Sequence, residues 1–90
     1  MTEISLFIKD EISGNETNID DVEDSLSLDD FLNMCEQHGF GPFSQLDSNG
    51  GIVVDGNPHA WTDELRKKTL ASLQVIDGSN IHVSISLKVA

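Results

Sequence analysis

The sequence predicts an α+β fold in which one helix packs against one face of a mixed β-sheet. Near both ends of the 90-residue chain, over 2–9 and 81–87, apolar and polar residues alternate as they do in half-buried strands. Between these ends, the stretch 25–39 repeats apolar residues at the spacing of a helix. Because one helix and one sheet face enclose one core, we expect a single domain over residues 1–90, with about four or five strands.

The first two strands are expected to form a hairpin within residues 1–21. Phe7 is an aromatic residue on the otherwise polar face of the first strand, a position that suits either cross-strand packing or a contact surface. A Ser-Gly-Asn sequence at 13–15 is typical of a turn. The strand expected after it, over 16–22, is short and acidic, which suits the edge of a sheet.

The helix carries its own start and stop signals. Ser27 is expected to cap it, because the serine hydroxyl can accept a free amide of the first turn. Gly39 is expected to end it. Its apolar stripe consists of Leu28, Phe31, Leu32 and Cys35. We interpret Cys35 as a small buried apolar residue, because with His38 it forms only half of a zinc site and the sequence holds no second pair.

After the helix, a loop over 40–51 is expected to be anchored on the core by Phe40, Phe43 and Leu46. A short central strand over 52–54, a tight turn, a return strand and a helical turn over 63–68 are expected next.

The first and last strands are the most apolar, and we therefore expect them to be the central, parallel pair of the sheet. Period-two alternation points Ile81, Val83 and Ile85 inward and His82, Ser84 and Ser86 outward. The predicted core comprises Ile4, Leu6, Ile8, Ile19, Leu28, Phe31, Leu32, Cys35, Ile52, Val54, Leu70, Ile81, Val83 and Ile85.

The chain is strongly acidic, with a formal net charge of −11. Nine acidic residues and no basic one lie between Asp10 and Asp30. This charge argues against nucleic acid as a direct ligand and against anionic membrane surfaces, because contacts to phosphate need Lys and Arg. The acidic segment is either a solvated face or a docking face for a basic protein. That docking face would comprise Asp20, Asp21, Glu23 and Asp24.

No catalytic, cofactor-binding or metal-binding motif is present in the sequence, and we therefore expect neither an enzyme nor a cofactor. Cys35 is the single cysteine, which excludes an intramolecular disulfide. The sequence shows no signal peptide and no apolar run long enough to span a bilayer. A cytoplasmic monomer is the resulting expectation.

Segments spread over nearly the whole chain resemble ubiquitin-like proteins of the β-grasp fold. They are the Ser27-Leu28 helix start with Phe31 and Cys35, the stretch Val53-Val54-Asp55-Gly56, Thr69-Leu70 with Val75, and the alternating strand from Ile81 to Leu87 with outward His82. The resemblance implies the order ββαββ, with a short helical turn before the last strand. It also implies action through protein–protein interaction, either as a binding module or as a small protein modifier of an unconventional, bacterial type of conjugation system.

Two departures from the family bear on function. Val89 and Ala90 stand where ubiquitin has its two terminal glycines, so an activating enzyme would have to accept a bulkier conjugation end. The partner surface implied by the resemblance comprises Phe7, Val53, His82 and Ser84, with Glu11 or Ile12 beside it. Because Ser84 removes an apolar centre, we expect ordinary ubiquitin receptors to bind poorly. The alternative function is a stand-alone acidic binder or inhibitor, of the immunity or DNA-mimic type, for a basic partner.

Overall fold

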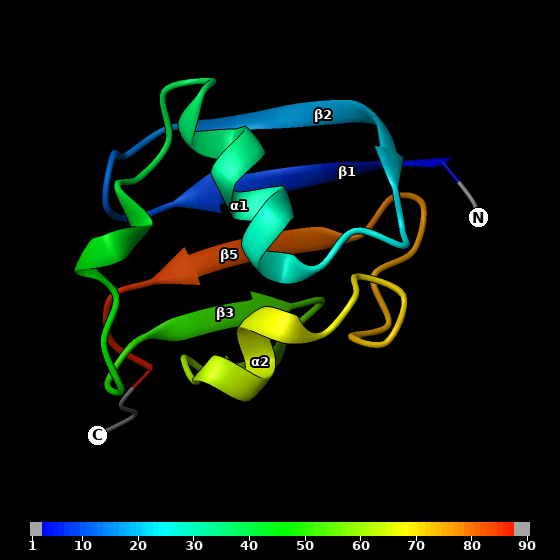
Figure 1. Ribbon diagram of the computed structural model, residues 1–90. Coiled ribbons are helices and arrows are strands. Elements are labelled where there is room, and N and C mark those ends of the chain that lie inside the picture. The colour runs from blue at the N-terminus through cyan, green and yellow to red at the C-terminus, as the bar shows by residue number, and fades with distance from the viewer. Residues whose placement is uncertain (1–2, 88–90) are drawn as a thin grey trace.

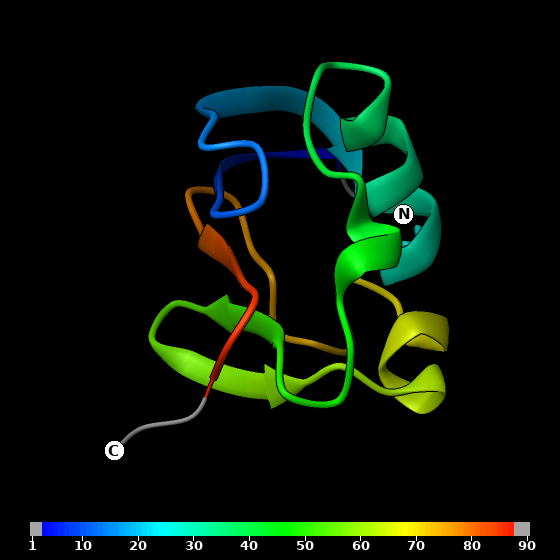
Figure 2. The ribbon, with the colours of Figure 1, turned by 90° about the vertical axis from the view of Figure 1, so that its left-hand side faces the viewer.

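The computed structural model describes residues 3–87 as two layers, a five-stranded sheet and the helices on one of its faces (Figures 1 and 2). The strands are β1 (Glu3–Asp10), β2 (Glu16–Glu23), β3 (Gly51–Val54), β4 (Asn57–Ala60) and β5 (Asn80–Ser84). The helices are α1 (Leu28–Glu36) and α2 (Asp63–Lys67), with a 3-10 turn over Phe43–Gln45. The predicted class and element order are confirmed, including the helical turn before the last strand.

The strand order in the sheet is β2-β1-β5-β3-β4. β1 and β5 run parallel, and every other neighbouring pair is antiparallel. The prediction that the first and last strands form the central parallel pair is therefore confirmed. β2 and β4 are the two edge strands, and Figure 1 shows β2 at the side of the sheet opposite to β3.

The core lies between the sheet and α1. Ile8 of β1 and Ile81 of β5 are partners in register, and both are buried. Phe40, Phe43 and Leu46 are buried as well, so the loop after α1 is anchored as predicted. The core also contains apolar residues that the prediction did not include: Val22, Leu65, Leu73 and Val75. Within residues 3–87, neither helix is long and apolar enough to cross a membrane.

α1 begins where the sequence predicts and is shorter than the stretch 25–39. The Ser27 hydroxyl accepts the amide of Asp30 at 3.1 Å, as expected of an N-cap. At the other end Gly39 has a φ of 95°, and the Phe40 amide donates to the Cys35 carbonyl at 3.2 Å. A left-handed glycine with this return bond is a common way to end a helix.

Two members of the predicted core are placed differently by the structure. Ile85 is 51% exposed, because β5 ends at Ser84, where its last partner in β3 is Gly51. Alternation beyond the last paired residue no longer defines an inner and an outer face. Ile19 faces the core but is only partly buried, because β2 is an edge strand and its side chains are covered on one side.

Candidate protein-interaction surfaces

The outer face of the sheet is the face that neither helix covers (Figure 2). In the β1–β5–β3 register, Lys9, His82 and Val53 stand in one row across three strands. Phe7 lies on the same face of β1, because it alternates with the buried Leu6 and Ile8. Phe7, Val53 and His82 are all half-buried. The structure thus brings three of the four predicted surface residues onto one face.

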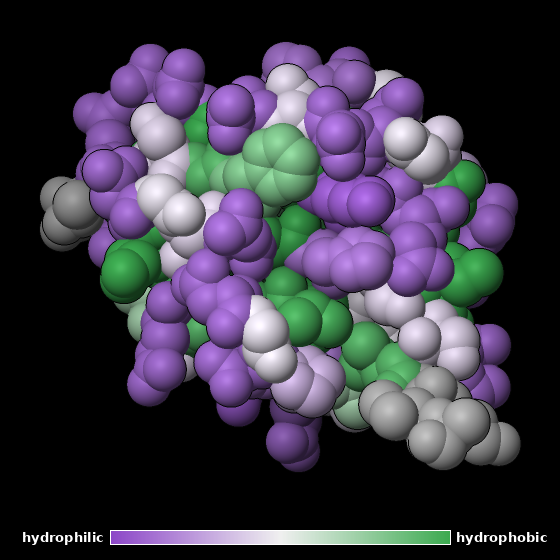
Figure 3. Space-filling view, turned by 180° about the vertical axis from the view of Figure 1, so that it is seen from behind, coloured by the Kyte–Doolittle hydropathy of each residue, from purple (hydrophilic) through white to green (hydrophobic). Residues whose placement is uncertain are grey.

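Hydrophobic residues on this face form separate areas between hydrophilic ones, and one of these areas adjoins the C-terminal end of the described chain (Figure 3). Within this row, Val53 provides apolar surface next to the imidazole of His82. A mixed surface of this kind is typical of non-obligate interfaces, whose polar rim surrounds a smaller apolar centre.

Glu11 gives the row a charged rim. Its Oε1 lies 3.2 Å from Nε2 of His82, and that nitrogen is screened from solvent without a well-aligned hydrogen bond to any described residue. The pair is an ion pair only when the imidazole is protonated.

Ser84 does not belong to the accessible surface, so the prediction was wrong for this residue. It is 5% exposed. Its hydroxyl donates to the Ser86 carbonyl at 2.8 Å and accepts the Ser86 amide at 3.2 Å. The chain turns over Ser84 after β5 ends, and the Leu87 amide then bonds the Asn49 carbonyl at 2.7 Å. The apolar residue exposed beside this turn is Ile85.

The predicted acidic docking face lies at the end of β2. Asp20, Asp21 and Glu23 are exposed, whereas Asp24 is half-buried and engaged with the rest of the protein. The register of β1 and β2 shifts at this point, and Asp21 has a φ of 59°. Such a bulge twists an edge strand and turns neighbouring side chains in different directions. The four acids therefore follow one another along the chain without forming one flat surface.

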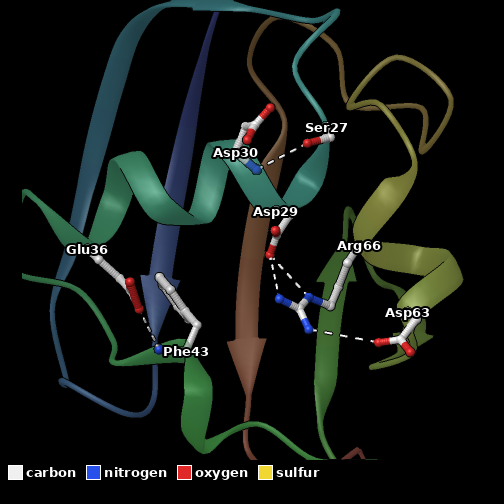
Figure 4. A network of polar contacts seen from close by, with 7 residues as sticks. All are labelled: Ser27, Asp29, Asp30, Glu36, Phe43, Asp63 and Arg66. Carbon is white, nitrogen blue, oxygen red and sulfur yellow. Dashed lines mark hydrogen bonds and ion pairs between the residues drawn. The ribbon is translucent and has the colours of Figure 1, made fainter.

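The helical face of the molecule carries a self-contained polar network (Figure 4). Arg66 of α2 binds Asp29 of α1 through two nitrogens at 2.9 and 3.1 Å, and its guanidinium carbon lies 5.5 Å from the centre of the Trp61 ring. Nearby, the Glu36 carboxylate accepts the Phe43 amide at 3.0 Å. The charge of Arg66 is thus already paired, and Trp61 is partly buried and packs against the core. Exposed ion pairs of this kind contribute only about 0 to 1 kcal/mol.

Two buried groups lie apart from these surfaces, and one of them was missed by the sequence analysis. Asp10 is fully buried, and its carboxylate accepts hydrogen bonds from Ile12, Ser13 and Gly41. The sequence could have indicated this burial, because Asp10 continues the alternation that points every second side chain of β1 inward. Burial, and secondly the charge of Asp10, raise the pKa of the Cys35 thiol to about 12.

A thiol with this pKa is protonated at neutral pH and is a poor nucleophile, which agrees with the reading of Cys35 as a structural residue. Within residues 3–87, no group of three or more His, Cys, Asp or Glu side chains is placed to hold a metal ion.

Comparison with known proteins was informative only at the level of structure. No protein-family model matches the chain, and no curated protein matches it. Among solved structures, the ubiquitin-like (UBL) domain of Plasmodium falciparum Dsk2 is similar with a TM-score of 0.65 and 21% identity, over 91% of this chain and 96% of that one. The chain has the ubiquitin-like β-grasp fold. Ubiquitin from Caldiarchaeum subterraneum is also similar, with a TM-score of 0.59 and 17% identity over 91% of both chains.

The UBL domain of yeast Ddi1 is a further neighbour, with a TM-score of 0.57 and 19% identity over 96% of this chain and 94% of that one. At such identities the comparison establishes the ubiquitin-like fold alone, because one fold serves many functions. The predicted conjugation end, Val89 and Ala90, lies outside the described residues.

Proposed function

We propose that this ubiquitin-like domain works by binding another protein through the outer face of its sheet. The observation that carries the proposal is the row of half-buried side chains, Val53 and His82 with Phe7 beside them, on the face that both helices leave open. Half-buried apolar side chains already sit in a fixed orientation, so a partner that covers them gains apolar burial at little further cost in side-chain entropy. The proposal assigns no catalytic step to the chain.

Replacing Val53 by aspartate is expected to weaken partner binding by at least about tenfold, because it puts a charge in place of the apolar side chain of the proposed contact surface. The matched control is Asn33→Asp, which adds the same charge at an exposed position on α1, on the opposite side of the sheet. The measurement is quantitative capture of proteins from the native host by each immobilised variant. Equal capture by Val53→Asp and by the control would contradict the proposal.

The acidic segment at the end of β2 supports a second candidate, the acidic binder of a basic partner. Its exposed members are Asp20, Asp21 and Glu23. The same capture experiment separates the two functions. A partner held by exposed charges is released as salt shortens the screening length to about 3 Å at 1 M, whereas a partner held by apolar contacts is retained.

The covalent form of the proposal gives the chain the role of a small protein modifier. It predicts that deleting Val89 and Ala90 abolishes conjugates in host cells, because the activated carboxylate would be displaced from its place in the activating enzyme. The readout is the ladder of tagged high-mass species on a denaturing gel. Replacing Lys88 by Arg is the control, since it keeps both the length and the charge. Conjugates that survive the deletion would restrict the protein to non-covalent binding.

A further inference from the structure

A cleft of about 320 Å³ lies on the helical face of the molecule, between α1, the 3-10 turn and α2. Its apolar lining consists of Leu32, Phe43, Leu46 and Trp61. The first three are buried core residues, whereas Trp61 is half-buried and keeps part of its indole accessible. Ligand sites range from about 300 to 1,000 Å³, so this cleft is at the small end and suits a single long side chain.

Two carboxylates of α1 line the same cleft. Asp29 lies in the first turn of the helix and Glu36 in the last, and Figure 4 shows them near its two ends. The Oε2 atom of Glu36 accepts the Phe43 amide at 3.0 Å, which holds the carboxylate at the cleft. Its other oxygen, Oε1, makes no hydrogen bond or ion pair with any residue from 3 to 87. Glu36 can therefore accept a donor from outside without giving up a contact.

The charge of the cleft is negative, although Arg66 also lines it. Arg66 binds Asp29 through two nitrogens, and its third nitrogen lies 3.9 Å from Asp63. With Glu36, three carboxylates stand against one guanidinium, which leaves a formal charge of −2. Lys67, the next residue of α2, lines a neighbouring hollow and not this cleft. The field in the cleft therefore favours a cation.

We propose that this cleft binds an arginine side chain of a partner protein. The planar guanidinium donates paired hydrogen bonds to a carboxylate, and it is more weakly hydrated than an ammonium group, so it suits Glu36. The apolar stem of the arginine would lie against Leu32, Leu46 and Trp61. The cleft thus offers a surface for each half of the same side chain.

Other occupants fit the cleft less well. A second copy of the chain is disfavoured, because each copy carries a formal net charge of −11 and the two would repel. An anionic group meets the same repulsion. A lysine carries the right charge, but its ammonium is strongly hydrated and lacks the planar fork. The inference shares with the proposed function only the premise that the domain binds proteins, and it concerns the opposite face of the sheet.

Trp61 reports directly on the cleft, because it is the only tryptophan of the chain and the chain has no tyrosine. The probe is a short peptide with blocked ends that carries one arginine among glycines and serines. Its titration into the full chain at low salt is followed by the fluorescence of Trp61 and by amide shifts in NMR spectra. We expect saturable binding with a dissociation constant below about 5 mM. A peptide with citrulline, which is neutral and nearly isosteric with arginine, is expected not to bind in this range.

Glu36→Gln is the decisive variant. It removes the charge and keeps an oxygen that can accept the Phe43 amide. We expect it to weaken binding of the arginine peptide by at least about fivefold. The matched control is Glu3→Gln, which removes the same charge at an exposed position on β1 away from the cleft. The control is expected to bind the peptide as the unchanged chain does, and thermal unfolding verifies that both variants are folded.

Asn33→Asp tests the same site by a gain of binding, which a damaged fold cannot imitate. Asn33 lines the cleft between the two carboxylates of α1, and an aspartate there adds a third. We expect it to tighten binding of the arginine peptide by about twofold or more. Because Asn33→Asp is also the control of the capture experiment, capture by Val53→Asp is compared with the unchanged chain as well.

Three results would overturn the inference: no fluorescence change or amide shift up to about 5 mM peptide, equal binding of the citrulline peptide, or equal binding by folded Glu36→Gln. Amide shifts centred on the acidic end of β2 would also overturn it, because they would show general attraction by that segment. Val53→Asp is expected to leave peptide binding unchanged. If the peptide fails to bind while Val53→Asp still lowers partner capture, only the cleft inference is refuted. If the peptide binds while Val53→Asp captures as well as the unchanged chain, only the proposed function is refuted.

Discussion

Replacing Asp10 by alanine is expected to lower the free energy of unfolding by about 3 to 4 kcal/mol. The carboxylate is fully buried and accepts four hydrogen bonds, from the amides of Ile12, Ser13 and Gly41 and from the Ser13 hydroxyl, at 2.7 to 3.3 Å. Three of these donors close the β1–β2 turn, and the Gly41 amide ties that turn to the loop after α1. Without the carboxylate, buried donors lose their acceptor and the two segments separate.

The predicted loss corresponds to a fall in the unfolding midpoint of about 12 to 30 °C, since a domain of this size loses about 4 to 8 °C per kcal/mol. Thermal and urea unfolding measure it. The matched control is Asp47→Ala, because Asp47 also accepts a turn amide, from Asn49 at 2.9 Å, but is exposed. The control is expected to lose about 1 kcal/mol or less. Similar losses in the two variants would mean that the burial of Asp10 contributes nothing.

The parts of the fold that the sequence predicted are those that local patterns encode. Alternation identified β1 and the last four residues of its parallel partner β5, from Ile81 to Ser84, and the Ser27 cap set the start of α1. The end of β5 could not be predicted in this way, because alternation continues through Ile85 while the neighbouring strand does not. β3 begins at Gly51, the partner of Ser84, so the strand ends where its non-local pairing ends.

The candidate surfaces also differ in how far local sequence patterns predict them. The outward orientation of Val53 and His82 follows from the alternation of inward and outward side chains within each strand. Pairing of β3 with β5 then brings the two residues together. By contrast, the pocket that Ile19 of β2 and Met34 of α1 line together depends on where α1 crosses the sheet, which is decided by tertiary packing. Asp10 shows the same limit, because one of its hydrogen-bond donors, Gly41, is 31 residues away in the sequence.

Raising the pH from 8 to 11 is expected to lower the free energy of unfolding by about 2 to 3 kcal/mol through Cys35 alone. Burial, and then the neighbouring charge of Asp10, raise the pKa of the thiol from its ordinary value of 9.0 to about 12 in the folded protein. A group whose pKa is higher in the folded state stabilises the fold fully below the unfolded pKa. That contribution is lost as the pH rises from about 9 towards 12, because the unfolded chain releases its proton first.

Cys35→Ala is the variant that isolates this effect, because it keeps every lysine and the chain has no tyrosine to titrate in this range. The variant is expected to be less stable at pH 8, since it loses a buried side chain, and to show a shallower decline towards pH 11. Urea unfolding at several pH values measures both curves. A second readout is labelling with a disulfide reagent at pH 8, where the raised pKa makes the thiolate much rarer in the folded protein than in the unfolded one. Parallel pH curves for the two proteins, or rapid labelling of the folded chain, would show that Cys35 is not shielded as its burial beneath α1 requires.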